Sequence, residues 1–216
     1  MKKLLLLLAL TSTPALAASP LAHRFSVELS GTANLALHDI ANDSMTAGLK
    51  VHTAGADITG VYTRSEHHAF TLRLSYAAGE ASESALYDGA VAYDVAGKLS
   101  SVSLMPGYRY TTRLSKRVQA FAGANLGLLC HEAEERESLG RAQEIRTRDK
   151  ALGLAYSLEL GLVYTRWEKW SCFVGYRFSG STAQPQLSWS DGEAAYSVKL
   201  NAQRYHSLTA GVRRQF

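Results

Sequence analysis

Cysteines and long apolar runs are scarce in this sequence, and each scarcity excludes a class of protein. The chain has 216 residues and only two cysteines, too few for a disulfide framework. Beyond residue 17 no run approaches the roughly eighteen consecutive apolar residues of a transmembrane helix. With 4 prolines, 17 glycines and 11 tyrosines, the composition suits either a soluble β-sandwich or a membrane β-barrel. The pattern along the chain has to decide between them.

The N-terminus has the three parts of a secretory signal peptide. Lys2 and Lys3 precede an uncharged run to Leu10, and the segment ends with alanine at positions 15 and 17. We expect residues 1–17 to be removed, and residues 18–216 to form one domain. No cysteine lies near this site to carry a lipid. Loss of the two lysines lowers the formal charge from +4 to +2, so we expect no nucleic-acid partner.

Apolar and polar residues alternate in eight segments of about ten residues, which is the pattern of membrane β-strands. In the clearest segment Phe70, Leu72 and Leu74 alternate with Thr71 and Arg73. We expect each strand to have one wholly apolar face and one polar or small face. The predicted strands are 23–33, 55–64, 69–78, 99–112, 117–130, 151–165, 170–180 and 204–216. The predicted fold is all-β, an eight-stranded antiparallel up-and-down transmembrane β-barrel.

The predicted connections alternate strictly in length. Three are tight turns, at 65–68, 113–116 and 166–169. Four are long and polar, at 34–54, 79–98, 131–150 and 181–203. Bacterial barrels have short periplasmic turns and longer external loops, so we place the tight turns and both chain ends on the periplasmic side. The pattern leaves open whether residues 85–98 add a further hairpin.

This orientation sorts the aromatic residues into two belts, as the interfaces of a membrane require. The predicted periplasmic belt comprises Phe25, Tyr62, Phe70, Tyr108, Tyr110, Tyr164, Trp170 and Phe216. The predicted outer belt comprises Tyr76, Tyr156, Tyr176 and Phe178. A sandwich would have no reason to distribute its aromatic residues in this way.

Three residues test the proposed register. Pro106 falls inside a strand that is paired on both sides, so we expect a bulge or a local break there. Cys130 and Cys172 fall at opposite ends of parallel strands with a third strand between them. A disulfide needs Cα atoms within about 7 Å, so we expect two unpaired thiols despite the oxidising compartment.

The C-terminal strand ends in an aromatic residue, and it resembles the signal that the outer-membrane barrel assembly machinery recognises. Its alternating residues are Leu208, Ala210, Val212 and Phe216, whereas Arg214 departs from the usual apolar residue. Residues 118–127 resemble the glycine-rich strand of small OmpX/OmpA-type barrels. The resemblance covers the chain from residue 18 onward, and it implies an integral protein of the outer membrane of a Gram-negative type cell.

The polar faces of the predicted strands carry seven charged residues. An eight-stranded barrel is only wide enough for side chains to fill its interior, so we expect these charges to pair across the lumen. A narrow ion path is the alternative. The seven residues are Glu28, Asp57, Arg73, Arg109, Glu159, Arg177 and Arg213.

The sequence shows no catalytic, cofactor-binding or metal-binding motif. Small membrane barrels include enzymes that modify lipid A, but the adjacent His206 and Ser207 would point to opposite faces of a strand. His131 begins an acidic segment that lacks the second histidine of an H-E-x-x-H motif. The mixed charges of 131–150 indicate a solvated hairpin or short helix, or a binding surface for a host, matrix or partner molecule.

We therefore expect a non-enzymatic outer-membrane barrel that serves envelope integrity or surface adhesion through its external loops. Its expected partners are membrane lipid, lipopolysaccharide and the barrel assembly machinery, with a possible surface ligand and no cofactor. A small pore or transporter is one alternative, and a lipid A modifying enzyme is another. Bilayer conductance would distinguish the first, and a changed lipid A mass spectrum the second.

Overall fold

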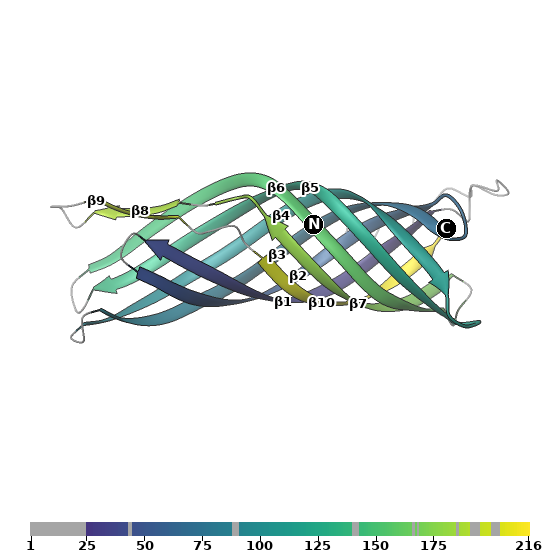
Figure 1. Cartoon of the computed structure of the whole chain (residues 1–216), viewed down its shortest axis with the longest axis horizontal. Coiled ribbons are helices and arrows are strands. Elements are labelled where there is room, and N and C mark those ends of the chain that lie inside the picture. Colours follow the sequence, from purple (N-terminus) through teal and green to yellow (C-terminus); the bar gives the residue numbers. More distant parts are fainter. Residues whose placement is uncertain are drawn as a thin grey trace, which may run out of the picture.

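Within the described residues, eight strands form one closed antiparallel barrel (Figure 1). This computed structural model describes residues 25–42, 45–87, 91–139, 143–165, 167, 169–184, 186–190, 195–199 and 204–216. The barrel strands are β1 (Phe25–Asn42), β2 (Met45–Thr63), β3 (His68–Tyr87), β4 (Val91–Arg113), β5 (Val118–Leu139), β6 (Gln143–Thr165), β7 (Trp170–Ser181) and β10 (Arg204–Gln215). Each pairs with its neighbour along the chain, and β10 pairs with β1 to close the ring. The predicted fold class is confirmed, whereas the predicted signal peptide lies outside the described residues.

The strands match the prediction at the tight turns but run much further at the other end. The β1–β2 ladder continues to the pair Asn42 and Met45, and the β5–β6 ladder to Leu139 and Gln143. The strand ends predicted at 34–54, 79–98 and 131–150 were therefore wrong, because the strands continue into these segments, whereas the hairpin that was one interpretation of 131–150 is present. Beyond a membrane both faces of a hairpin meet water, so backbone pairing continues without the apolar alternation that revealed the strands.

A short hairpin occupies the last long connection. The strands β8 (Gln186–Ser190) and β9 (Ala195–Lys199) pair as a separate two-stranded sheet. Figure 1 shows this hairpin beside the end of the barrel opposite the C-terminus. The additional hairpin thus lies in 181–203, whereas residues 85–98 continue the β3–β4 ladder as far as Tyr87 and Val91.

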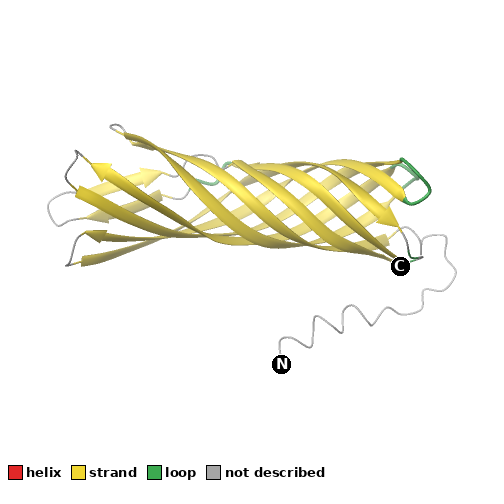
Figure 2. Cartoon of the chain, turned by 90° about the horizontal axis from the view of Figure 1, so that it is seen from below, coloured by secondary structure: helices red, strands yellow, loops and turns green. Residues whose placement is uncertain are grey.

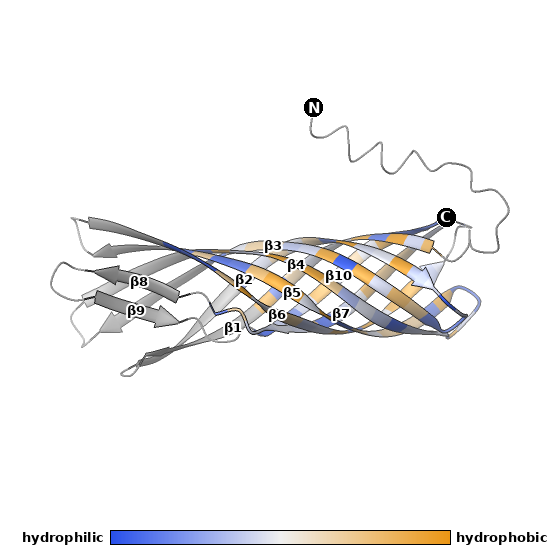
Figure 3. Ribbon diagram, turned by 90° about the horizontal axis from the view of Figure 1, so that it is seen from above, coloured by the Kyte–Doolittle hydropathy of each residue, from blue (hydrophilic) through white to orange (hydrophobic). Residues whose placement is uncertain are grey.

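Side chains alternate between a polar lumen and an apolar outer face, as predicted. On β3, Leu72 is 54% exposed while Arg73 is 1% exposed, and strict alternation recurs along most of β7. Figure 3 shows apolar and polar residues alternating along the strands in the part of the barrel between its two ends. The exposed leucines and valines of the described strands form an apolar outer face, which is the surface that a barrel presents to lipid. Within the described ranges, no helix is long and apolar enough to cross a membrane.

The tight turns lie at the same end of the barrel as the C-terminus (Figure 2). Backbone hydrogen bonds from Arg64 N to His68 O, 2.8 Å, and from Leu114 N to Val118 O, 2.9 Å, close two of the turns. Next to them the ladder aligns Phe25 with Tyr62, and Phe70 with Tyr108. These rings form part of the expected aromatic belt, and they are 38–48% exposed on the outer face.

The structure agrees with what the predicted register implies for Pro106, Cys130 and Cys172. The β4–β5 ladder is interrupted between the pairs at Leu104 and Gly107, which flank Pro106, and it resumes in the same register. The expected local break is therefore present without a bulge. Cys130 and Cys172 are both free, as predicted.

Two matched leucine-to-arginine variants test whether the outer face of the barrel contacts lipid. Leu160 on β6 and Leu114 in a tight turn are equally exposed, at 61% each. Leu160→Arg should cost about 2–4 kcal/mol in reversible unfolding from lipid vesicles, because it places a charge near the bilayer midplane. Leu114→Arg should change the stability by no more than about 0.5 kcal/mol, as surface substitutions do. Equal stabilities of the two variants would contradict the assignment of the outer face.

Candidate functional site in the barrel lumen

Inward side chains fill the lumen in three layers, which follow one another from the tight turns to the external hairpins. An apolar cluster lies near the tight turns, a network of ion pairs occupies the middle, and a hydroxyl-lined cavity lies on the external side. All eight barrel strands contribute residues to the cavity. The lumen is therefore the part of the molecule where polar chemistry is concentrated away from bulk water.

The layer near the tight turns consists of Phe121, Val163 and Phe173, all less than 9% exposed. The two phenyl rings meet edge to face with centroids 6.5 Å apart. Glycine makes room for them, because a Cβ at Gly161 would lie 2.5 Å from the ring of Phe121. The expectation that one face of every strand is polar or small was therefore wrong here, since apolar side chains also fill this narrow lumen.

The middle layer is built around Arg109, which bonds two carboxylates. Its two terminal nitrogens donate to Glu28 Oε1 and Oε2 at 2.5 and 3.0 Å, in a bidentate pair. Its Nε and Nη2 also donate to Glu159 Oε1, at 3.2 and 3.0 Å. The guanidinium lies over the ring of Phe121, 4.5 Å from its centroid. Arg109 thereby links β4 to β1, β6 and the apolar layer.

Two more arginines complete this network. Arg213 donates to Glu28 through Nε at 2.8 Å and Nη2 at 2.5 Å, across the seam where β10 meets β1. Arg73 pairs with Glu159, and it also donates to Thr59 and Ser157 at 3.4 Å. Each carboxylate therefore receives hydrogen bonds from two arginines, which is the arrangement that offsets the cost of burying charge.

The remaining two charged residues form a separate pair at the edge of the external cavity. Arg177 Nη2 donates to Asp57 Oδ2 at 2.8 Å, and Ser30 donates to the same oxygen at 3.3 Å. In the strand ladder Arg177 stands opposite Glu159, yet it forms its ion pair with Asp57 on β2. All seven residues selected from the sequence are thus buried, at 1–8% exposure.

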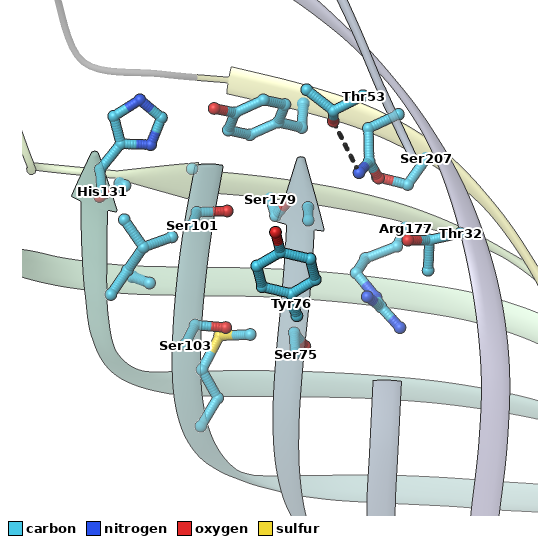
Figure 4. A pocket seen from close by; sticks show the side chains of 18 of the residues that line it. Thr32, Thr53, Ser75, Tyr76, Ser101, Ser103, His131, Arg177, Ser179 and Ser207 are labelled. Atoms are coloured by element: carbon cyan, nitrogen blue, oxygen red, sulfur yellow. Dashed lines mark hydrogen bonds between the residues drawn. The ribbon is translucent and has the colours of Figure 1, made fainter. Parts of the chain in front are cut away.

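The external layer is a cavity of about 70 Å³ whose wall combines hydroxyl groups with apolar side chains such as Leu99 and Met105. Its hydroxyl groups come from several strands, and Figure 4 shows how they surround the space. The lining includes Thr32, Thr53, Ser75, Ser101, Ser103, Ser179 and Ser207, together with His131 and Arg177. The sequence pattern placed these serines on the polar faces, but it could not show that they surround one cavity.

His131 was wrongly assigned to the start of an external loop. The side chain is 1% exposed, and it lies on β5 opposite Ser101 of β4. Its position one residue after the outward Cys130 was the signal that could have placed it inward. By contrast, His206 and Ser207 do point to opposite faces, because His206 is exposed beside Tyr176 while Ser207 is 2% exposed.

Comparison with known proteins agrees with this architecture. The model of the family described as outer membrane protein beta-barrel domain matches residues 4–216. The chain belongs to the outer membrane protein beta-barrel domain family. It is accordingly an outer-membrane protein, as the sequence pattern predicted. Among curated proteins, none matches the chain.

Solved structures show how widely the fold is shared. The outer membrane protein OprG from Pseudomonas aeruginosa aligns over 90% of this chain and 97% of its own, with a TM-score of 0.61 and 13% identity. The outer membrane protease OmpT from Escherichia coli aligns over 94% of this chain and 100% of its own, with a TM-score of 0.56 and 9% identity. Identities this low show a common fold and carry no information about activity.

The ion-pair network should contribute strongly to stability. Glu159→Gln removes the charge that both Arg73 and Arg109 contact, so the barrel should lose about 3–5 kcal/mol in reversible unfolding. Glu66→Gln, in an exposed tight turn, is the matched control and should stay within about 0.5 kcal/mol of wild type. Indistinguishable unfolding curves for the two variants would show that the network does not hold the barrel together.

Proposed function

We propose that this family member is a non-enzymatic surface-binding barrel, closed to solutes in its middle and bearing its ligand-binding elements on long external hairpins. The observation that carries the proposal is the extension of β3, β4, β5 and β6 as paired strands beyond the apolar belt. Paired strands hold side chains in a defined arrangement, which an unstructured loop of the same composition does not.

A rim of outward charges supports the position of the membrane boundary. On β6 the outward series changes from Leu154 and Leu152 to Lys150 and Arg148. Lys150 Nζ lies 3.5 Å from Glu132 Oε2 on β5, and Arg148 also pairs with Glu132. The exposed lysine and arginine side chains suit lipopolysaccharide phosphates, which we propose as their partners.

Beyond this rim the hairpins project well away from the lipid. In β5 the strand continues from Ala133 to Leu139, and β6 returns from Gln143. At about 3.3 Å per residue this corresponds to roughly 20 Å of strand outside the belt. External segments of this kind are where binding residues gather on a rigid scaffold, which supports adhesion or partner binding at the hairpin tips.

The filled lumen supports the non-enzymatic and non-pore parts of the proposal. Arg109 and its two carboxylates cross the interior, and Phe121 lies against them on the periplasmic side. Within the described ranges no three His, Cys, Asp or Glu residues are grouped as a metal site. We further propose that residues 1–17 direct export, and that Leu208, Ala210, Val212 and Phe216 present the strand that the assembly machinery recognises.

Conductance in planar bilayers tests whether the lumen is closed. The wild-type barrel should show no steady current, because the network and the apolar cluster fill the path. The combined variant Glu28→Ala, Arg109→Ala and Glu159→Ala should conduct, since it removes the central side chains. Arg148→Ala on the external rim is the control and should remain silent. A steady wild-type current would favour a pore instead.

A shortened hairpin tests surface binding. Joining residue 134 to residue 148 through an Asn-Gly turn removes the outer part of β5–β6 while restoring a favoured two-residue hairpin. More cells producing the full chain should adhere to wells coated with basement-membrane matrix than to wells coated with albumin. Cells producing the shortened variant should lose most of that excess. Heat-modifiable mobility should show both barrels folded. Equal adhesion by both, or no excess over albumin, would contradict the proposed role of this hairpin.

A further inference from the structure

The external cavity of the lumen has the chemistry of an anion site. We propose that it binds one small oxyanion, such as sulfate, phosphate or the carboxylate of a small solute, between Arg177 and the surrounding serine hydroxyls. This inference is independent of the proposed surface-binding role, because it concerns the lumen and does not involve the hairpin tips.

The first observation is an imbalance of buried charge. Among the described buried side chains there are four guanidinium groups, Arg73, Arg109, Arg177 and Arg213, and three carboxylates, Glu28, Asp57 and Glu159. Glu28 and Glu159 form ion pairs with three of the arginines, and Asp57 forms an ion pair with the fourth, Arg177. Among these seven buried groups the positive charges exceed the negative charges by one. An uncompensated buried charge is costly, so a bound anion would stabilise this arrangement.

The second observation identifies where that anion would bind. Arg177 is 8% exposed and donates through Nη2 to Asp57, but its buried Nε has no hydrogen-bond partner. Ser75 Oγ is also buried without a partner. Both residues line the same cavity. Two buried polar atoms that lack partners in one cavity indicate a missing polar ligand, because such atoms are almost always satisfied in folded proteins.

The walls of the cavity define the ligand further. Arg177, Ser75 and Ser103 surround the space together with Ser101 and Ser207, as Figure 4 shows. Hydroxyl groups and a guanidinium can all donate hydrogen bonds to oxyanion oxygens. The positive excess disfavours a cation, and the hydroxyl groups and the guanidinium in the wall favour a ligand that accepts hydrogen bonds. A volume of about 70 Å³ has room for a group the size of sulfate with a few waters, but not for an oligosaccharide.

The cavity also lies on the side from which a solute could arrive. Its lining includes Leu99, His131 and Ser181, which are at the level of the external rim beside the outward Lys98. The network and the apolar cluster close the opposite side. The site is therefore a blind pocket that faces the exterior, and its ligand would be retained rather than conducted.

Titration calorimetry of the folded full-length barrel in detergent tests this site. Sodium sulfate, sodium phosphate and sodium acetate are titrated separately at constant ionic strength, with sodium chloride as the background salt. At least one oxyanion should bind at a single saturable site. Ser75→Ala should weaken binding about three- to tenfold, because it removes one hydroxyl from a charged ligand. Ser103→Leu, which fills the cavity without touching the ion pairs, should abolish binding.

Two further variants separate ligand contact from general damage. Asp57→Asn with Arg177→Gln removes the ion pair as a neutral unit and should abolish oxyanion binding. Ser171→Ala alters a lumen serine that is 3% exposed but lies outside the cavity, so it should bind as wild type does. Heat-modifiable mobility verifies that each variant is folded. The proposal is overturned if no oxyanion binds the wild type, or if Ser75→Ala and Ser103→Leu bind as tightly as Ser171→Ala.

Discussion

The contact of Arg109 with Glu28 and Glu159 is the interaction on which the interior of this barrel depends. An eight-stranded barrel has a lumen only wide enough for side chains, and these side chains are removed from bulk water. Arg109 spans that space from β4 to β1 and β6. Arg213 and Arg73 then attach to the same two carboxylates, so the closing strand β10 and strand β3 join the network. Loss of one member would leave charges without compensation in a place that water cannot freely reach.

The other two layers of the lumen follow from this central one. Toward the tight turns, Phe121 covers the guanidinium of Arg109 and packs edge to face against Phe173. On the external side, the pair formed by Arg177 and Asp57 lies at the edge of a hydroxyl-lined cavity. The excess of one guanidinium over the carboxylates makes this cavity the favourable place for an anion. The same set of buried charges thus fills the middle of the lumen and favours an anion in the cavity.

Much of the fold could be predicted because a strand has a side-chain period of two. Outward residues such as Leu72 and Leu160 and inward residues such as Arg73 and Glu159 follow from that period alone. Outside the membrane both faces of a hairpin are solvated, so the apolar alternation is lost, and the outer parts of β1 to β6 were therefore predicted as long connections between shorter strands. His131 was misplaced because the predicted strand ended at Cys130, although the parity of His131 agrees with its burial.

The sequence by itself determined the strand faces, the order of tight and long connections, the aromatic belts and the separation of Cys130 from Cys172, because each depends on local periodicity and chain direction. Only the tertiary structure decided which arginine meets which carboxylate. Arg177 faces Glu159 in the ladder but pairs with Asp57 on β2, a residue 120 positions away in the chain. That choice depends on the curvature and width of the closed barrel, which bring residues on non-adjacent strands together and have no counterpart in local sequence pattern.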